Sequence, residues 1–261
     1  GGVHGIFVSG SQGESFSMTM DEKKRVIATS IEASDGRVPI YAGTGTITTN
    51  EAVLLTKMAR ELGADAVSVT TPYFIKPSQN ELIDYYKSVS DSAEDMPVLL
   101  YGNPTRTGVI IDVATVVELA KIDNIVGMKD SSADMVQTTA YIEATKGMDF
   151  SVLVGNDACI FMALISGGKG AVAATANVAP EIIVGIYDAF QAGDIEKARD
   201  LQFRLLPIRR AFNLGTFPVV IKDALNMMGL PAGPARKPIK SLSEDKRDLL
   251  KKVLSDAGLL R

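Results

Sequence analysis

The sequence predicts an α/β fold of the TIM-barrel class, (β/α)8, and three observations support this prediction. Short apolar runs alternate regularly with amphipathic stretches of helical periodicity. The runs are mostly apolar on both faces, which is typical of parallel strands covered on both sides. Polar residues and glycines follow nearly every run, where a barrel places its active site, whereas a doubly wound sheet gathers its site near one switch point.

Seven strands are expected before the chain becomes wholly helical. They are Gly5–Ser9, Pro39–Ala42, Ala66–Thr70, Pro97–Tyr101, Ile125–Met128, Ser151–Val154 and Gly170–Ala174. An eighth strand is needed to close a barrel. Because the sequence enters a strand directly after Gly1 and Gly2, we expect the first strand-helix unit to be missing.

Helices are expected between the strands, and three of them begin with the capping-box pattern of a Ser or Thr followed three residues later by Glu. These pairs are Thr19 with Glu22, Thr48 with Glu51 and Ser78 with Glu81. The helix after Thr48 has apolar periodicity as far as Leu62, and Gly63 supplies a C-terminal stop.

The C-terminal part is expected to be a helical extension. Its predicted helices are Glu181–Gln191, Ile195–Ala211, Phe217–Met228 and Glu244–Asp256, and Pro207 is expected to kink or break the second of them. We therefore predict a barrel over residues 1–180 and C-terminal helices packed on it over residues 181–261.

Composition excludes several classes of function. The chain has 261 residues, is 46% hydrophobic and carries a net charge of -4 without a charged tail, so no nucleic-acid partner is expected. The single cysteine and the single histidine, His4, provide neither a disulfide framework nor a His/Cys metal site. The longest apolar run is too short to cross a bilayer, and no signal peptide is visible, so we expect no membrane association and a cytoplasmic location.

Lys129 and Tyr101 are the candidate catalytic residues, because each ends a predicted strand and neighbouring parallel strands bring their ends together. A partly desolvated lysine has a lowered pKa and can attack a carbonyl carbon as the neutral amine. A tyrosine beside it can transfer protons. The alternatives are an ordinary ion pair for Lys129 and a half-buried aromatic side chain for Tyr101.

Two loops are candidate carboxylate-binding elements. The loop Gly10–Glu14 has glycines that let backbone N–H groups approach an anion, and Ser11 adds a hydroxyl group. Arg106 can bind a second carboxylate through its planar guanidinium group. The alternatives are a plain turn for the loop and a surface ion pair for Arg106.

Taken together, these segments resemble the dihydrodipicolinate synthase and N-acetylneuraminate lyase family over nearly the whole chain. Gly10–Glu14 resembles the family's G-[ST]-T-G-E pyruvate-carboxylate loop, and Tyr101–Gly108 resembles its Y-N-x-P-x-R-T-G segment. Lys129–Ser132 is similar to the Schiff-base lysine and the turn after it. Gly155–Asp157 resembles the G-[DS]-D element that faces the site, and Val172 matches the apolar residue packed beside bound pyruvate.

The resemblance implies that Lys129 forms a Schiff base with pyruvate and that Tyr101 transfers protons. It implies substrate contacts for the following residues: Ser11, Gln12, Arg106, Gly155, Asn156, Asp157 and Val172. It also implies a (β/α)8 barrel, a homo-oligomer (dimer or tetramer), small-molecule substrates, and no metal or organic cofactor.

Three positions depart from the family pattern. Gln12 stands where a second threonine is usual, Gly102 stands where asparagine is usual, and Phe74 replaces the second tyrosine that follows Thr-Pro in the synthases. Phe74 removes a hydroxyl group that, in the family, reaches across a dimer toward the residue equivalent to Tyr101. Arg106 argues for the synthase, because the sugar-acid lyases of the family generally lack this arginine.

The function that the resemblance implies is a pyruvate-dependent lyase acting through a lysine Schiff base, most closely a 4-hydroxy-tetrahydrodipicolinate synthase, which condenses pyruvate with aspartate semialdehyde. Two alternatives stay open. One is an aldolase or N-acetylneuraminate-lyase-like enzyme acting on 2-keto-3-deoxy sugar acids, with Asn156 and Asp157 binding hydroxyl groups. The other is a non-catalytic carboxylate-binding relative.

Overall fold

The computed structural model describes residues 1–260, which form two compact units. The sheet unit comprises His4–Gly10 and Met18–Val172. The C-terminal unit comprises Gly1–Val3, Ser11–Ser17 and the residues from Ala173 onward. No helix among residues 1–260 has the length and apolarity needed to span a membrane.

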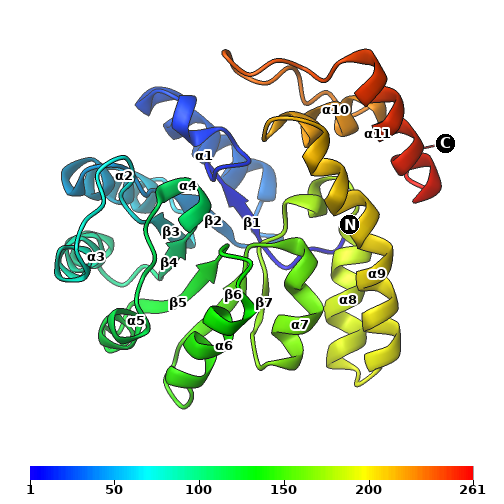
Figure 1. Cartoon of the computed structure of the whole chain (residues 1–261). Helices are drawn as coiled ribbons and strands as arrows, with labels where there is room; N and C mark the ends of the chain where they lie inside the picture. The colour runs from blue at the N-terminus through cyan, green and yellow to red at the C-terminus, as the bar shows by residue number, and fades with distance from the viewer. Residues whose placement is uncertain (261) are drawn as a thin grey trace. The chain divides into compact units, whose positions relative to one another are not determined.

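The sheet unit contains one parallel sheet whose seven strands follow one another in sequence order (Figure 1). The strands are β1 (Ile6–Val8), β2 (Ile40–Gly43), β3 (Ala66–Thr70), β4 (Val98–Gly102), β5 (Ile125–Asp130), β6 (Ser151–Val154) and β7 (Gly170–Ala171). An order without reversal is that of a barrel and excludes a doubly wound sheet, which needs a switch point. The expected parallel α/β architecture is therefore confirmed.

Helices connect the strands: α1 (Met20–Ser34), α2 (Thr49–Glu61), α3 (Gln79–Ala93), α4 (Pro104–Thr107), α5 (Val113–Leu119), α6 (Met135–Ala144) and α7 (Ile160–Ile165). The predicted capping boxes at Thr19 and Ser78 have both of their hydrogen bonds. At Thr48 only one is present, in which the threonine hydroxyl accepts from the Glu51 N–H. Gly63 follows α2 in the left-handed conformation, as expected of a stop.

The core of the sheet unit lies between the sheet and its helices. Its strand residues alternate along each strand, as Val67 and Val69 do on β3 and Val98 and Leu100 do on β4. Because alternate side chains point to opposite faces, the residues that alternate with these, such as Leu99 and Tyr101, face away from the helices. This second face carries the candidate catalytic side chains.

The C-terminal unit is helical. Its elements are η1 (Ser15–Ser17), η3 (Ala174–Asn177), α8 (Pro180–Gln191), α9 (Ile195–Ala211), η4 (Phe212–Leu214), α10 (Val219–Met227) and α11 (Glu244–Asp256). Two expectations are corrected by the structure. Pro207 does not break α9, which continues to Ala211. The last strand is shorter than expected and ends at Ala171, and the 3-10 turn η3 begins at Ala174.

Candidate active site

Lys129 on β5 and Tyr101 on β4 are direct register partners, so the parallel pairing brings their side chains together. Lys129 is 7% exposed and Tyr101 is 5% exposed. The Lys129 Nζ atom lies 4.0 Å from the centroid of the Tyr101 ring. The amine therefore lies against an aromatic face in a site from which water is largely excluded.

Phe7 on β1 forms a second aromatic wall of this site. Its ring centroid is 4.8 Å from Lys129 Nζ and 6.2 Å from the Tyr101 ring, which it meets edge to face at 80°. Sequence reasoning missed Phe7. An aromatic residue inside the first strand was the available signal, but β1 and β5 are far apart in the strand order.

Burial lowers the pKa of Lys129, because removing the ammonium from water disfavours its charged form. Three interactions raise the pKa of Lys129: the charge of Tyr101, a hydrogen bond with Tyr101 and the charge of Asp157. Together they offset the effect of burial only in part. Asp157 is almost fully buried in the 3-10 turn η2 (Asp157–Cys159) that follows β6. Burial therefore increases the fraction of the Lys129 amine that is neutral, and hence nucleophilic, at a given pH.

Gly155 leaves the space that the Lys129 side chain occupies. A β-carbon at this position would lie 1.8 Å from Ser131 Oγ and 2.7 Å from Lys129 Cε. Real β-carbons do not approach other atoms so closely, so no larger residue fits without displacing the lysine. Gly155 N–H also donates to the carbonyl oxygen of Asp130 at 2.7 Å, which fixes this close approach.

The turn after Lys129 is held by the buried carboxylate of Asp130. This carboxylate accepts hydrogen bonds from the Ser132 N–H and hydroxyl groups, both at 2.9 Å, and from the Thr138 hydroxyl at 2.6 Å. Ser131 N–H donates to the carbonyl oxygen of Gly102 at 2.8 Å. The end of β5 is thus fixed both to α6 and to β4.

Asn103 is a further residue that sequence reasoning did not single out. Its side-chain nitrogen donates to the Tyr101 hydroxyl oxygen at 2.9 Å, and its side-chain oxygen accepts from the Thr105 hydroxyl at 2.9 Å. An amide donor on the phenol oxygen leaves the phenol proton available to another group. Asn103 therefore orients the group that we expect to transfer protons.

Residues 1–257 match the dihydrodipicolinate synthetase family. The chain belongs to this family. The 4-hydroxy-tetrahydrodipicolinate synthase of Methanoculleus marisnigri is 43% identical over 98% of this chain and 88% of that protein.

Solved structures of the family agree closely with this fold. The dihydrodipicolinate synthase of Thermotoga maritima is 36% identical, with a TM-score of 0.96 over 99% of this chain and 88% of that one. The dihydrodipicolinate synthase of Acinetobacter baumannii, solved as a complex with pyruvate, is 36% identical, with a TM-score of 0.95 over the same shares of the two chains.

The other predicted site residues of the sheet unit lie at the ends of strands. The Asn156 side chain caps η2 by accepting from the Ala158 N–H at 3.1 Å. Val172 follows β7, and its N–H donates to the Val154 carbonyl oxygen at 2.9 Å. Arg106 lies on α4 after β4 and is exposed. The predicted substrate contacts of all three stay predictions.

Ser11 and Gln12 belong to the C-terminal unit. The Gln12 side-chain nitrogen donates to the Pro218 carbonyl oxygen at 3.3 Å, and its side-chain oxygen is buried without a hydrogen-bond partner among residues 1–260. The glutamine that replaces the family's second threonine is therefore engaged with the segment before α10.

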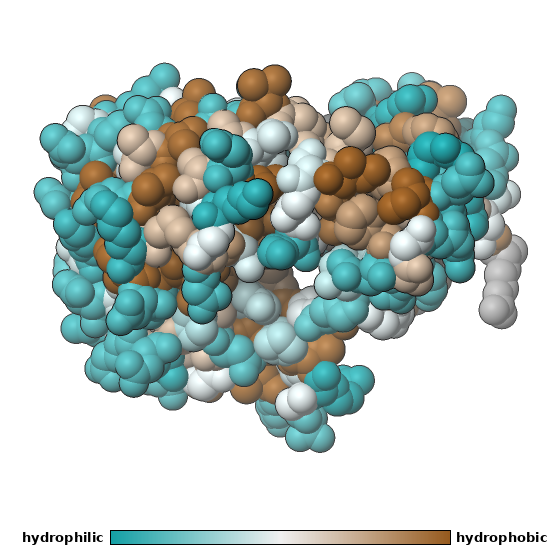
Figure 2. All heavy atoms as spheres, turned by 90° about the horizontal axis from the view of Figure 1, so that it is seen from below, coloured by the Kyte–Doolittle hydropathy of each residue, from teal (hydrophilic) through white to brown (hydrophobic). Residues whose placement is uncertain are grey.

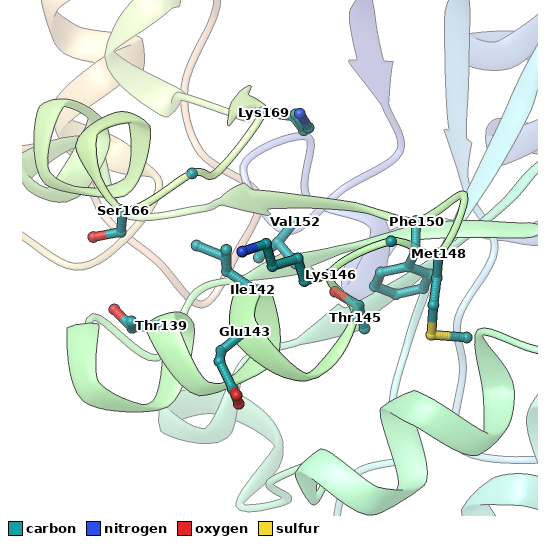
Figure 3. Close-up of a pocket in the computed structure, with 12 residues that line it drawn as sticks. Thr139, Ile142, Glu143, Thr145, Lys146, Met148, Phe150, Val152, Ser166 and Lys169 are labelled. Carbon is teal, nitrogen blue, oxygen red and sulfur yellow. The ribbon is translucent and has the colours of Figure 1, made fainter.

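A separate pocket of about 470 Å³ lies in the sheet unit (Figure 3). It is lined by residues of α6, by Phe150 and Val152 at the start of β6, and by Lys169 just before β7. None of the predicted site residues lines it. The pocket lies at the amino ends of these strands, whereas Lys129 lies near the carboxyl end of its own strand.

Proposed function

We propose that the chain is a pyruvate-dependent carbon-carbon lyase and, specifically, a 4-hydroxy-tetrahydrodipicolinate synthase in which Lys129 forms the Schiff base. The observation that carries this proposal is the buried Lys129 amine with its lowered pKa, held against Tyr101. The names of the relatives support the same activity. The family's pyruvate complex supports pyruvate as the first substrate.

The proposed reaction begins when the neutral Lys129 amine adds to the keto carbon of pyruvate. The resulting carbinolamine takes up a proton and loses water to give an iminium ion, and loss of a methyl proton then gives an enamine. The enamine carbon adds to the aldehyde carbon of aspartate semialdehyde, whose oxygen takes up a proton. Tyr101 transfers these protons, and Asn103 holds its phenol oxygen in place.

The resemblance to the family supports binding roles for the remaining residues, which we propose as follows. Arg106 binds the carboxylate of aspartate semialdehyde as a bidentate pair. Gly155, Asn156, Asp157 and Val172 surround the substrate at the ends of β6 and β7, and Ser11 and Gln12 receive the carboxylate of pyruvate. Gly155 has the clearest structural support, because only a residue without a side chain leaves room for Lys129.

We also propose that the seven-stranded sheet belongs to a (β/α)8 barrel. The consecutive parallel order and the TM-scores of 0.95 and 0.96 support this. The division of the chain at residue 180 and the cytoplasmic location stay predictions.

A homo-oligomer is the proposed assembly. Large apolar side chains lie exposed on the sheet unit, and Phe74 (87%), Val136 (83%) and Ile75 (72%) are the most exposed of them. Figure 2 shows apolar residues at the surface among hydrophilic ones on one face of the molecule. Phe74 and Ile75 are neighbours in the chain, and exposed apolar surface that is contiguous is typical of protein interfaces. Sedimentation of the purified chain tests this proposal, and a monomer at all concentrations contradicts it.

Borohydride trapping tests the activity. Reduction in the presence of pyruvate is expected to add one pyruvyl group to Lys129, located by peptide mass spectrometry, and Lys129→Ala is expected to abolish the addition. Lys121, which forms a surface ion pair with Glu118, is the matched control lysine. No labelling of the parent chain would support the non-catalytic alternative, and labelling that persists in Lys129→Ala would place the Schiff base on another lysine.

A further inference from the structure

The loop Ser11–Ser17 is fixed within the C-terminal unit by one buried carboxylate. The Glu14 carboxylate accepts from Lys222 Nζ at 2.5 Å and from the Arg236 backbone N–H at 2.7 Å. Lys222 lies on α10, and Arg236 lies between α10 and α11. Glu14 therefore joins the loop to segments that are 208 and 222 residues away in the sequence.

Two further contacts tie the ends of the same loop to this region. The Gln12 side-chain nitrogen donates to the Pro218 carbonyl oxygen, and the Arg236 guanidinium donates to the Ser17 carbonyl oxygen, both at 3.3 Å. With Glu14 between them, these contacts hold the loop at three points. The C-terminal segments thus determine the conformation of a loop near the start of the chain.

The conformation that they hold is a strained one. Glu14 has a φ of 59°, which lies in the left-handed region that residues with a side chain rarely adopt. Its N–H donates to the Ser11 carbonyl oxygen at 3.2 Å, which closes a tight turn. Such a backbone persists only where the surroundings enforce it, and here the contacts of the Glu14 carboxylate do so.

The turn from Ser11 to Glu14 contains hydrogen-bond donors that have no partner among residues 1–260. Within residues 1–260, the Ser11 hydroxyl and the backbone N–H groups of Gln12 and Gly13 have no hydrogen-bond partner. Successive open N–H groups in a turn form a concave site for an anion. Because the Gln12 side-chain nitrogen is engaged with Pro218, these are the donors that the turn offers to a carboxylate.

We propose that Glu14 and Lys222 are positioning residues that hold these donors in place and thereby set the affinity for pyruvate; this inference rests on the proposed function. The pair is poorly explained as a source of stability, because buried ion pairs contribute little compared with apolar packing. Their best-attested role is to select one conformation. Here that conformation is the strained turn from Ser11 to Glu14.

The test is the dependence of borohydride trapping on pyruvate concentration, measured on the full chain. Glu14→Gln and Lys222→Met are each expected to raise the half-saturating pyruvate concentration about tenfold or more. The reason is that hydrogen-bond donors moved out of position bind the carboxylate of pyruvate less tightly. The trapping rate at saturation is expected to change by less than about twofold, because Lys129 is untouched. The double variant is expected to behave like either single variant, since the two residues act as one pair.

Asp223→Asn is the matched control. Asp223 is the neighbour of Lys222 on α10, is as buried as Glu14, and accepts from the Leu242 N–H at 3.0 Å rather than from the loop. It is expected to lower the melting temperature without changing half-saturation. Lys222→Arg keeps the charge and is expected to retain most of the affinity. If Glu14→Gln fails to fold, Glu14→Asp provides the test, with a smaller increase of the same kind expected.

Methyl pyruvate separates carboxylate binding from a general effect on the site, because the ester lacks the negative charge. The parent is expected to trap pyruvate at lower concentrations than methyl pyruvate, and the Glu14 and Lys222 variants are expected to lose this preference. Unchanged half-saturation in both variants, an equal rise for both compounds, or the same rise in Asp223→Asn would overturn the inference. Failure of the parent to trap pyruvate would overturn the proposed function, and the inference with it.

Discussion

The Lys129 amine lies 4.0 Å from the centroid of the Tyr101 ring, and the two residues face each other as register partners on β5 and β4. A cation in this position is attracted by the ring. Burial nevertheless lowers the pKa of Lys129 by more than the charge and hydrogen bond of Tyr101 raise it. The same burial that makes the amine nucleophilic therefore opposes folding in the protonated state.

Lys129→Met is expected to stabilise the fold at pH 7 by roughly 0.5–2 kcal/mol, because it removes the penalty for burying an amine. The folded-state pKa of Lys129 lies below its unfolded value of 10.5, so the unfolded chain binds more protons between these two values. The gain is therefore expected to shrink as the pH rises toward 10.5. Denaturant melts of both proteins at pH 7 and pH 10 check this, and a destabilised Lys129→Met would contradict it.

Tyr101→Phe is expected to move the rising limb of the pH profile of pyruvate trapping to lower pH. Interactions with Tyr101 raise the pKa of Lys129, so their loss lowers it further and favours the neutral amine at lower pH. Turnover is expected to fall by roughly 10²–10⁴ because a positioned proton-transfer group is lost. A limb that moves to higher pH would show that Tyr101 does not act on Lys129 in this way.

Gly155→Ala is expected to abolish trapping and to destabilise the fold by about 1–3 kcal/mol, because the added methyl group overlaps Ser131 and Lys129. Gly102→Ala is the matched control, since a β-carbon there meets nothing nearer than the Lys129 carbonyl oxygen at 4.0 Å. We expect Gly102→Ala to keep both activity and stability. Trapping assays and thermal melts of the two variants, compared directly, decide between a steric requirement and general sensitivity of the site.

Arg106→Ala is expected to raise the KM for aspartate semialdehyde by tenfold or more while leaving pyruvate trapping nearly intact. The reason is that the guanidinium is proposed to pair only with the second carboxylate, and a charge-assisted pair of this kind is worth about 1.5–3 kcal/mol. Steady-state kinetics with each substrate varied in turn measure the two effects. Loss of pyruvate trapping would instead indicate that Arg106 binds pyruvate or supports the structure.

Phe74→Tyr distinguishes the synthase from the sugar-acid aldolase. The Phe74 ring is almost fully exposed in this chain and has no hydroxyl group for a proton relay. If the chain is a synthase, restoring the hydroxyl is expected to keep or raise turnover of aspartate semialdehyde, by up to the roughly 10²–10⁴ typical of acid-base assistance. Cleavage of a 2-keto-3-deoxy sugar acid, without semialdehyde turnover in either protein, would favour the aldolase.

Much of the sheet could be predicted because its determinants are local. Strands such as Ala66–Thr70 and Ser151–Val154 begin and end where the apolar runs do, and helix Glu244–Asp256 has its predicted bounds. The local effect of Pro207 predicts a kink or a break, yet the flanking residues continue α9 through it. Packing of a helix along its whole length can outweigh the loss of one backbone hydrogen bond.

The sequence by itself determined the order of strands and helices, and with it the adjacency of Lys129 and Tyr101, because consecutive parallel strands place their carboxyl ends side by side. Only the tertiary structure decided that Phe7 forms the second wall, that Gly155 leaves room for the lysine, and that Glu14 pairs with Lys222. These contacts join residues distant in the chain, and no local pattern of residue types records which distant side chains will meet when the chain folds.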